Sequence, residues 1–191
     1  MTVEKVVLEF EHKAIAALIE FAAKNDIRYY LNGIYFEVKD GKSVVAATNG
    51  HALGAIYSSI NTDATNVSLI VPRHAIEIAI KAGKVIGKSF PLSIEITGDR
   101  AVLLWNKNEG IVFAPIEAKF PDIERVIPKN VSGEISTINW GYLRAFEKAS
   151  QILTGAKSWV PPKIGYNGNA GALITVPAFP NFTGVVMPIR A

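Results

Sequence analysis

The residues that could do chemistry are few and widely spaced. The chain has three histidines, His12, His51 and His74, and no cysteine, so the sequence predicts no zinc-type metal site. It contains no nucleophile elbow, phosphate-binding glycine loop or suitably spaced carboxylate pair. An enzyme would need a cluster of Thr48, His51 and Arg125, whereas a corner histidine that hydrogen-bonds loop backbone is the simpler interpretation of His51. We therefore expect a non-catalytic protein with no cofactor.

The composition indicates a folded protein that does not span a membrane. Hydrophobic residues make up 49% of the chain and charged residues 19%, so we expect a buried core. No apolar run approaches the ~20 residues that cross a bilayer, and residues 1–13 contain no signal-peptide core. With no cysteine, this predicts a cytoplasmic protein. The net charge of +3 permits contact with nucleic acid but does not alone indicate tight phosphate binding.

Residues 6–58 predict a first unit of one strand, one helix and three strands. Apolar residues alternate over 6–10, as in a strand, and then follow helical spacing over 12–25. Strand periodicity then returns in three segments, 34–38, 43–49 and 52–58. An Asp40-Gly41 turn joins the first two of these, and a tight Asn49-Gly50 corner precedes the third.

The same order recurs after a polar loop over 61–66. Residues 67–71 predict a strand, and Pro72 stands where helices commonly begin, with helical spacing continuing to about Lys84. Three further strands are predicted, at 92–96, 101–105 and 110–116.

A third, looser unit follows a linker at 120–130. Its predicted opening strand is 135–138, and Asn139 is a plausible N-cap for a helix over 140–153. Short strands are predicted near 163–166, 171–176 and 182–188, where prolines interrupt the pattern.

The chain thus contains three β-α-β-β-β units of about 60 residues. We predict an α+β fold with helices on one face of antiparallel sheets. Two units would form a complete domain over 1–119, residues 120–133 a linker, and 134–191 a partial domain. The third unit has no internal partner, so its exposed helix stripe predicts a homo-oligomer.

Five segments, in the same order, resemble the bacterial DNA polymerase III β subunit, the sliding clamp. They are 28–33 (RYYLNG), 48–53 (TNGHAL), 71–73 (VPR), 120–130 (FPDIERVIPKN) and 185–191 (VVMPIRA). The resemblance covers 6–130 as the clamp's whole middle domain and, beyond that, only the first helix and last strand of its third domain. The clamp's first domain is absent, which suggests a truncated, phage or mobile-element version.

The resemblance implies a pocket for a partner's short apolar-aromatic peptide. The matching residues are Leu31, Thr48, Gly50, His51, Leu53, Pro121, Arg125, Val126, Val185, Val186, Met187, Pro188, Ile189 and Arg190. Taken singly, the apolar members fit an ordinary core, and only as a set do they favour a pocket. Ala52 replaces an arginine of the family, and Ala191 replaces its terminal leucine.

The resemblance also implies weak, sequence-independent contact with duplex DNA. The candidate residues are Lys24, Arg28, Tyr29, Tyr30, Arg73, His74, Lys81, Lys84, Arg144 and Lys148. Arginine beside tyrosine suits phosphate contact and base stacking. A mixed, solvent-exposed helix face is the alternative interpretation of the helical cations.

The predicted function is that of a clamp-like accessory protein of DNA replication, which binds a polymerase peptide and helps processivity. The alternative is a regulatory decoy that occupies the clamp-binding motif of a polymerase or other replication protein without encircling DNA. Oligomeric state and the effect on primer extension separate the two.

Overall fold

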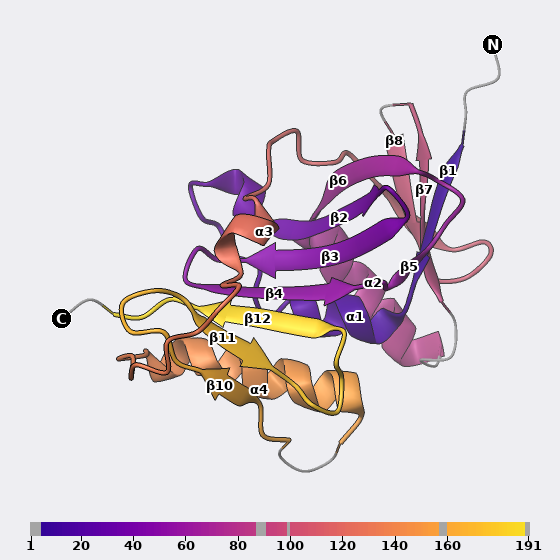
Figure 1. The fold of residues 1–191 in the computed structure, drawn as a ribbon. Coiled ribbons are helices and arrows are strands. Elements are labelled where there is room, and N and C mark those ends of the chain that lie inside the picture. The colour runs from indigo at the N-terminus through magenta and orange to yellow at the C-terminus, as the bar shows by residue number, and fades with distance from the viewer. Residues whose placement is uncertain (1–4, 87–90, 99, 157–159, 190–191) are drawn as a thin grey trace.

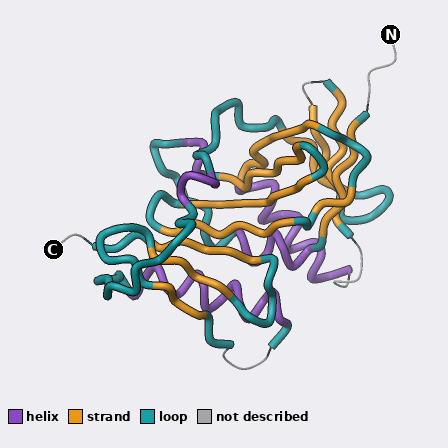
Figure 2. The backbone as a smooth tube through the Cα atoms, in the orientation of Figure 1, coloured by secondary structure: helices purple, strands orange, loops and turns teal. Residues whose placement is uncertain are grey.

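The structure is a computed structural model that describes residues 5–86, 91–98, 100–156 and 160–189, apart from the side chains of 84–86 (Figure 1). The described part folds into two antiparallel sheets with three main helices packed behind the larger one (Figure 2). This is the α+β arrangement that the periodicity predicts.

The larger sheet has seven strands and joins the first unit to the third. Its strand order is β10 (Lys163–Gly165), β11 (Ala172–Thr175), β12 (Phe182–Val186), β4 (Ala52–Tyr57), β3 (Lys42–Thr48), β2 (Gly33–Lys39) and β6 (Asn66–Pro72). The β2–β3 turn has positive φ at Asp40 (49°) and Gly41 (73°), as a two-residue hairpin requires. At the junction, Val186 of β12 pairs with Ala52 of β4.

The smaller sheet has five strands. Its order is β5 (Ile60–Asn61), β1 (Val6–Phe10), β7 (Leu92–Thr97), β8 (Arg100–Leu104) and β9 (Gly110–Phe113). The first strands of the first two units are exchanged, because β1 pairs with β7 of the second unit while β6 pairs with β2 of the first. The two units therefore form one interlocked body.

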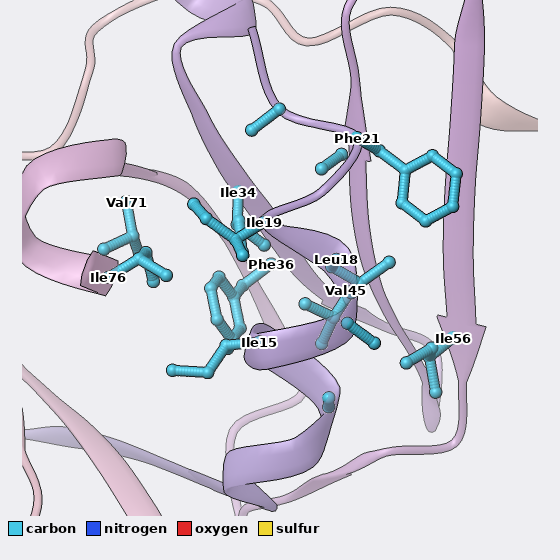
Figure 3. Packing of buried hydrophobic residues seen from close by; sticks show 14 of the residues in the cluster. Ile15, Leu18, Ile19, Phe21, Ile34, Phe36, Val45, Ile56, Val71 and Ile76 are labelled. Carbon is cyan, nitrogen blue, oxygen red and sulfur yellow. The ribbon is translucent and has the colours of Figure 1, made fainter. Parts of the chain in front are cut away.

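The helices fill one side of the seven-stranded sheet. They are α1 (His12–Leu18), α2 (Arg73–Ile86) and α4 (Trp140–Thr154). Ile34, Phe36 and Val45 point from the strands toward α1 and α2 and are fully buried (Figure 3). Alternation along each strand sends the intervening side chains to the opposite face of the sheet.

The third unit does not leave its helix stripe exposed, so the basis given for self-association is wrong. Helix α4 packs against α1, and Phe146 of α4 is fully buried between Phe21 and Phe182. The Phe21 and Phe146 ring centroids are 4.8 Å apart. The helix starts as predicted, because the Asn139 Oδ1 accepts a hydrogen bond from the Gly141 N–H at 2.8 Å.

The first helix is shorter than predicted. It was expected over 12–25, but α1 ends at Leu18. The Arg73 Nη1 donates to the carbonyl oxygens of Ile19, at 3.1 Å, and Ala22, at 2.8 Å. Those acceptors are therefore taken by a side chain 50 residues away, and the chain turns instead of continuing the helix.

The predicted strand at 135–138 is also wrong. This segment does not join a sheet. The residues just before it bond instead to the loop after β10: the Gly133 N–H donates to the Tyr166 carbonyl at 2.9 Å, and the Gly168 N–H donates to the Glu134 carbonyl at 2.8 Å. Ile135 is 84% exposed, so its apolar spacing does not mark a buried face. The third unit consequently lacks an opening strand.

Smaller differences concern segment ends and short elements. The strand predicted over 110–116 ends at Phe113, and the one predicted to 188 ends at Val186. Three short elements went unpredicted: β5, the 3-10 turn η1 (Tyr29–Leu31) and, inside the predicted linker, helix α3 (Ile123–Val126).

Candidate peptide-binding site

A cavity of about 230 Å³ lies where the seven-stranded sheet meets the linker. Its lining comes from η1, the β3–β4 corner, β12, α3 and the chain just before and after them. The lining residues are Arg28, Tyr30, Leu31, Thr48, Gly50, His51, Ala52, Leu53, Pro121, Val126, Val185 and Met187. Residues more than 150 positions apart thus line one cavity.

The floor of the cavity is set by strand register. Leu53 of β4 lies opposite Val185 of β12 and next to Thr48 of β3. Leu53 and Val185 belong to a small buried cluster on the face of the sheet away from the helices. Their neighbours Ala52 and Val186 point into the main core instead, as alternation requires.

The corner at one wall is fixed by its own hydrogen bonds. The Thr48 hydroxyl donates to the Ala52 carbonyl at 2.8 Å and accepts from the Gly50 N–H at 3.0 Å. The Asn49 Oδ1 accepts from the N–H groups of His51 and Ala52, both at 2.9 Å. Gly50 has a φ of 88°, a backbone conformation that favours glycine. The predicted tight corner is therefore a rigid wall.

The roof is the linker around α3. Phe120 stacks on Tyr35 of β2, with ring centroids 4.7 Å apart and planes 4° apart, and Ile123 is buried beside it. Burial raises the pKa of Tyr35 to about 12, with a further contribution from Glu37. The Asp122 side chain caps α3 by accepting from the Arg125 N–H. This anchoring holds Pro121 and Val126 over the cavity.

His51 joins the cavity to the third unit. Its ring stacks on Tyr142 of α4, with centroids 4.9 Å apart and planes 5° apart, and its carbonyl accepts from the Met187 N–H at 2.8 Å. The conceivable catalytic cluster does not assemble: the Thr48 hydroxyl donates to backbone, and the Arg125 side chain is 87% exposed. The sequence offered no signal for Tyr142.

Arg28 lies against the glycine corner rather than extending freely to solvent. Its Nε and Nη2 donate to the Asp26 carboxylate at 3.0 and 2.8 Å, and Nη2 also reaches the Asn49 carbonyl at 3.3 Å. These hydrogen bonds to Arg28 lower the pKa of Asp26 to about 2. A Cβ on Gly50 would lie 2.7 Å from the Arg28 Nη1. Gly50 thus makes room for the guanidinium.

Most of the predicted pocket residues come together. The nine that line the cavity are Leu31, Thr48, Gly50, His51, Leu53, Pro121, Val126, Val185 and Met187. Val186 is fully buried in the main core, and Arg125 pairs with Asp122 at 3.2 Å on the surface. Pro188 and Ile189 lie beyond the cavity lining, and Arg190 lies outside the described residues.

The predicted DNA-contacting residues lie in different environments. Arg28 and Tyr30 line the cavity, and the Arg73 guanidinium is engaged by backbone carbonyls and by Glu77 at 2.8 Å. The exposed members are Lys24, Tyr29, His74, Lys81, Arg144 and Lys148. Lys148 pairs with Glu20 at 3.0 Å, and the Lys84 side chain lies outside the described residues.

Neither a metal centre nor a membrane-spanning helix is found in the part of the chain that the structure describes. No group of three or more acidic or histidine side chains there could hold a metal ion. None of the helices within it is long and apolar enough to cross a bilayer.

Solved structures with the same architecture define the class of fold. A crystal structure of the DNA polymerase III subunit beta from Pseudomonas aeruginosa superposes with a TM-score of 0.72 at 19% identity, covering 97% of this chain and 66% of that one. The DNA polymerase III beta subunit from Thermotoga maritima gives 0.66 at 15% identity over the same shares. The fold is that of a DNA clamp, as the resemblance implied.

The sequence places the chain in a particular family within that class. Residues 8–122 match the family model of the DNA polymerase III beta subunit, central domain, and the chain belongs to this family. The beta sliding clamp of Haemophilus influenzae is 31% identical over 151 residues, 76% of this chain and 40% of that protein. That of Escherichia coli K12 is 32% identical over 109 residues, 56% and 29% respectively. The chain thus spans less than half the length of these relatives.

Proposed function

We propose that this protein is a sliding-clamp-like accessory of DNA replication, which binds a short peptide of a DNA polymerase or another replication protein and does no chemistry of its own. The observation that carries the proposal is the cavity between β4, β12 and the linker. Its floor and roof are apolar, its corner wall is held by hydrogen bonds, and one cation borders it. Such a site suits a peptide with apolar or aromatic anchors.

Arg28 supplies the polar part of the recognition. Asp26 engages its Nε and Nη2, while Nη1 makes no hydrogen bond within the described residues. The guanidinium is thus oriented before a ligand arrives, which reduces the entropy lost on binding. We expect Nη1 to meet a carbonyl or carboxylate oxygen of the peptide.

The exposed cations of the helix side support weak contact with duplex DNA. Lys24, Lys81 and Arg144 are exposed, as is the neighbouring polar residue His74 of α2, and the net charge of the chain is only +3. Contacts of this kind are sequence-independent and weaken steeply with salt. They suit a protein that moves along DNA rather than one that reads it.

Peptide binding tests the cavity directly. A fluorescently labelled peptide with paired apolar and aromatic anchors should bind the wild-type chain in a polarisation assay. Val126→Glu should reduce the affinity at least tenfold, because it places a charge in the apolar roof. Ile78→Glu is the matched control, since Ile78 is 40% exposed and Val126 37% exposed, but Ile78 lies on α2 away from the cavity. Equal affinities for the two variants would contradict the proposal.

The second candidate function is that of a decoy. It is favoured because two cations on the helix side are already bound by other groups of the protein. Arg73 is bound to backbone and Lys148 to Glu20, which leaves fewer charges for DNA. Primer extension by the peptide's polymerase separates the two functions. Longer products with the protein present indicate the accessory function; shorter products that recover with Val126→Glu indicate the decoy. No effect on extension would contradict both.

A further inference from the structure

Strand β9 ends the five-stranded sheet with its outer edge unpaired. It pairs only with β8, and no other described segment lies beside it in the sheet. The other sheet ends differ. The Ile116 N–H donates to the Ile70 carbonyl of β6 at 2.9 Å, and the Gly133 N–H donates to the Tyr166 carbonyl just after β10 at 2.9 Å. The remaining edge strand, β5, is two residues long.

The β8–β9 hairpin shows which N–H and C=O groups of β9 point away from β8. The Trp105 N–H donates to the Glu109 carbonyl at 3.1 Å, so this is a hydrogen-bonded pair. In antiparallel strands such pairs alternate with non-bonded ones. Ile111 and Phe113 therefore bond to β8, while the N–H and C=O groups of Gly110, Val112 and Ala114 point away from it.

The side chains on this edge are unusual for an unprotected strand. Proteins commonly guard an open edge with lysine or another charge. Here the run from Gly110 to Pro115 carries no charge, and Val112 is 65% exposed. Pro115 has no N–H and so limits any added pairing to the residues before it.

We propose that β9 pairs antiparallel with β9 of a second copy of this chain, about a two-fold axis at Val112. Val112 then bonds to Val112 of the partner subunit, and Gly110 to the partner's Ala114. The two five-stranded sheets become one continuous sheet. This contact replaces the helix stripe as the basis for self-association, because that stripe is buried.

A second copy is the occupant that the edge fits best. An uncharged strand meets no like-charge repulsion when it faces itself. A two-fold contact uses the same patch on both copies and closes as a dimer. The net charge of +3 adds little repulsion between copies. Because the strand is only four residues long, the dimer should be weak and concentration-dependent.

Cysteine cross-linking tests the register, since the natural chain has no cysteine. At a hydrogen-bonded pair the two Cα atoms lie about 5.5 Å apart, which a disulfide spans. Val112→Cys should therefore form a covalent dimer quickly under mild oxidation. Glu109→Cys is the control, because its two copies would lie six positions apart, roughly 20 Å. Equal cross-linking of the two variants, or none in either, would overturn the proposal.

Sedimentation of the unmodified chain supplies the second measurement. Wild-type protein should shift from monomer to dimer as its concentration rises toward the millimolar range. Val112→Pro should remain monomeric, because it removes an outward N–H while leaving the bonds to β8 in place, and circular dichroism should show the same fold. Dimerisation that survives this substitution would refute pairing through β9. Peptide binding should be unchanged in Val112→Pro, so the two proposals fail separately.

Discussion

The two faces of the seven-stranded sheet are built from the same strands but differ in how completely they are filled. On the helix side, Ile34, Phe36 and Val45 are fully buried beneath α1 and α2 (Figure 3). On the other side, a linker with one short helix covers a smaller cluster, and a cavity of about 230 Å³ is left open. Complete filling suits stability, whereas incomplete cover leaves room for a ligand.

This division of tasks depends on alternation along individual strands. Val185 and Val186 are adjacent, yet one lines the cavity and the other lies in the main core. A register shift of one residue would exchange them. Substitutions on the helix side should therefore change the free energy of unfolding, and those on the linker side should change binding.

The largest expected effect is on the helix side. Phe146→Ala should lower the free energy of unfolding by about 3–5 kcal/mol, because it opens a cavity between Phe21 and Phe182. Chemical denaturation measures the change. Trp140→Ala, on the same helix but 84% exposed, is the control and should change stability little. Similar losses for both variants would mean that α4 is not packed as described.

Gly50→Ala should affect both stability and binding, which makes it the sharpest test of the cavity wall. A left-handed backbone costs a non-glycine residue about 1–2 kcal/mol, and the new Cβ would displace the Arg28 guanidinium. Thermal melting and peptide polarisation measure the two effects. Gly41→Ala, also at positive φ but with open space around its Cβ position, should lose stability without losing affinity. Undiminished peptide affinity in Gly50→Ala would contradict a function for Arg28.

The helix cap should give a smaller change confined to stability. Asn139→Ala removes the acceptor for the Gly141 N–H and should cost about 1 kcal/mol. Asn139→Ser, which retains a capping oxygen, should recover most of that loss. Differential scanning calorimetry can resolve both variants. A change in peptide affinity larger than the change in stability would show that the two faces are coupled through α4.

The smallest expected effect depends on pH. The pKa of Asp26 falls from its ordinary value near 3.8 to about 2, first through hydrogen bonds from Arg28. A carboxyl whose pKa is lower in the folded state stabilises the fold above its unfolded pKa, and this contribution disappears as the pH falls through the folded value. The stability difference between wild type and Asp26→Asn should thus be constant above about pH 5, shrink as the pH falls, and be lost only below about pH 2. An unchanged difference at pH 2 would exclude the ion pair as its cause.

Sequence patterns correctly predicted those elements whose structure depends on interactions between residues close together in the chain. The Asp40-Gly41 hairpin, the Asn139 cap and the Asn49-Gly50 corner each depend on residues within a few positions of one another. The end of α1 could not be predicted, because Arg73, more than 50 positions later, takes the carbonyls of Ile19 and Ala22. Long-range hydrogen bonds of this kind leave no periodic signal.

The motifs predicted most of the residues that line the cavity but not the positions of all their side chains. Val126 was predicted to line the cavity and does, but Arg125 was placed there with it. Because α3 was not predicted, nothing in the sequence indicated that these two neighbours would face opposite ways. Arg28 was assigned to DNA from the resemblance and from its residue type. Its actual position depends on Asp26 and on the missing side chain of Gly50.

The exchange of first strands sets the order in which the chain can fold during its synthesis. Val6 of β1 finds its partner Ile96 only after about 90 further residues have been made. At 5–20 residues per second, β1 waits on the order of 10 s for β7. During that interval the edge of β1 that β7 will cover has no partner strand. Slow elongation should therefore increase co-translational aggregation, and a ribosome stalled before β7 should display a trappable, chaperone-dependent intermediate.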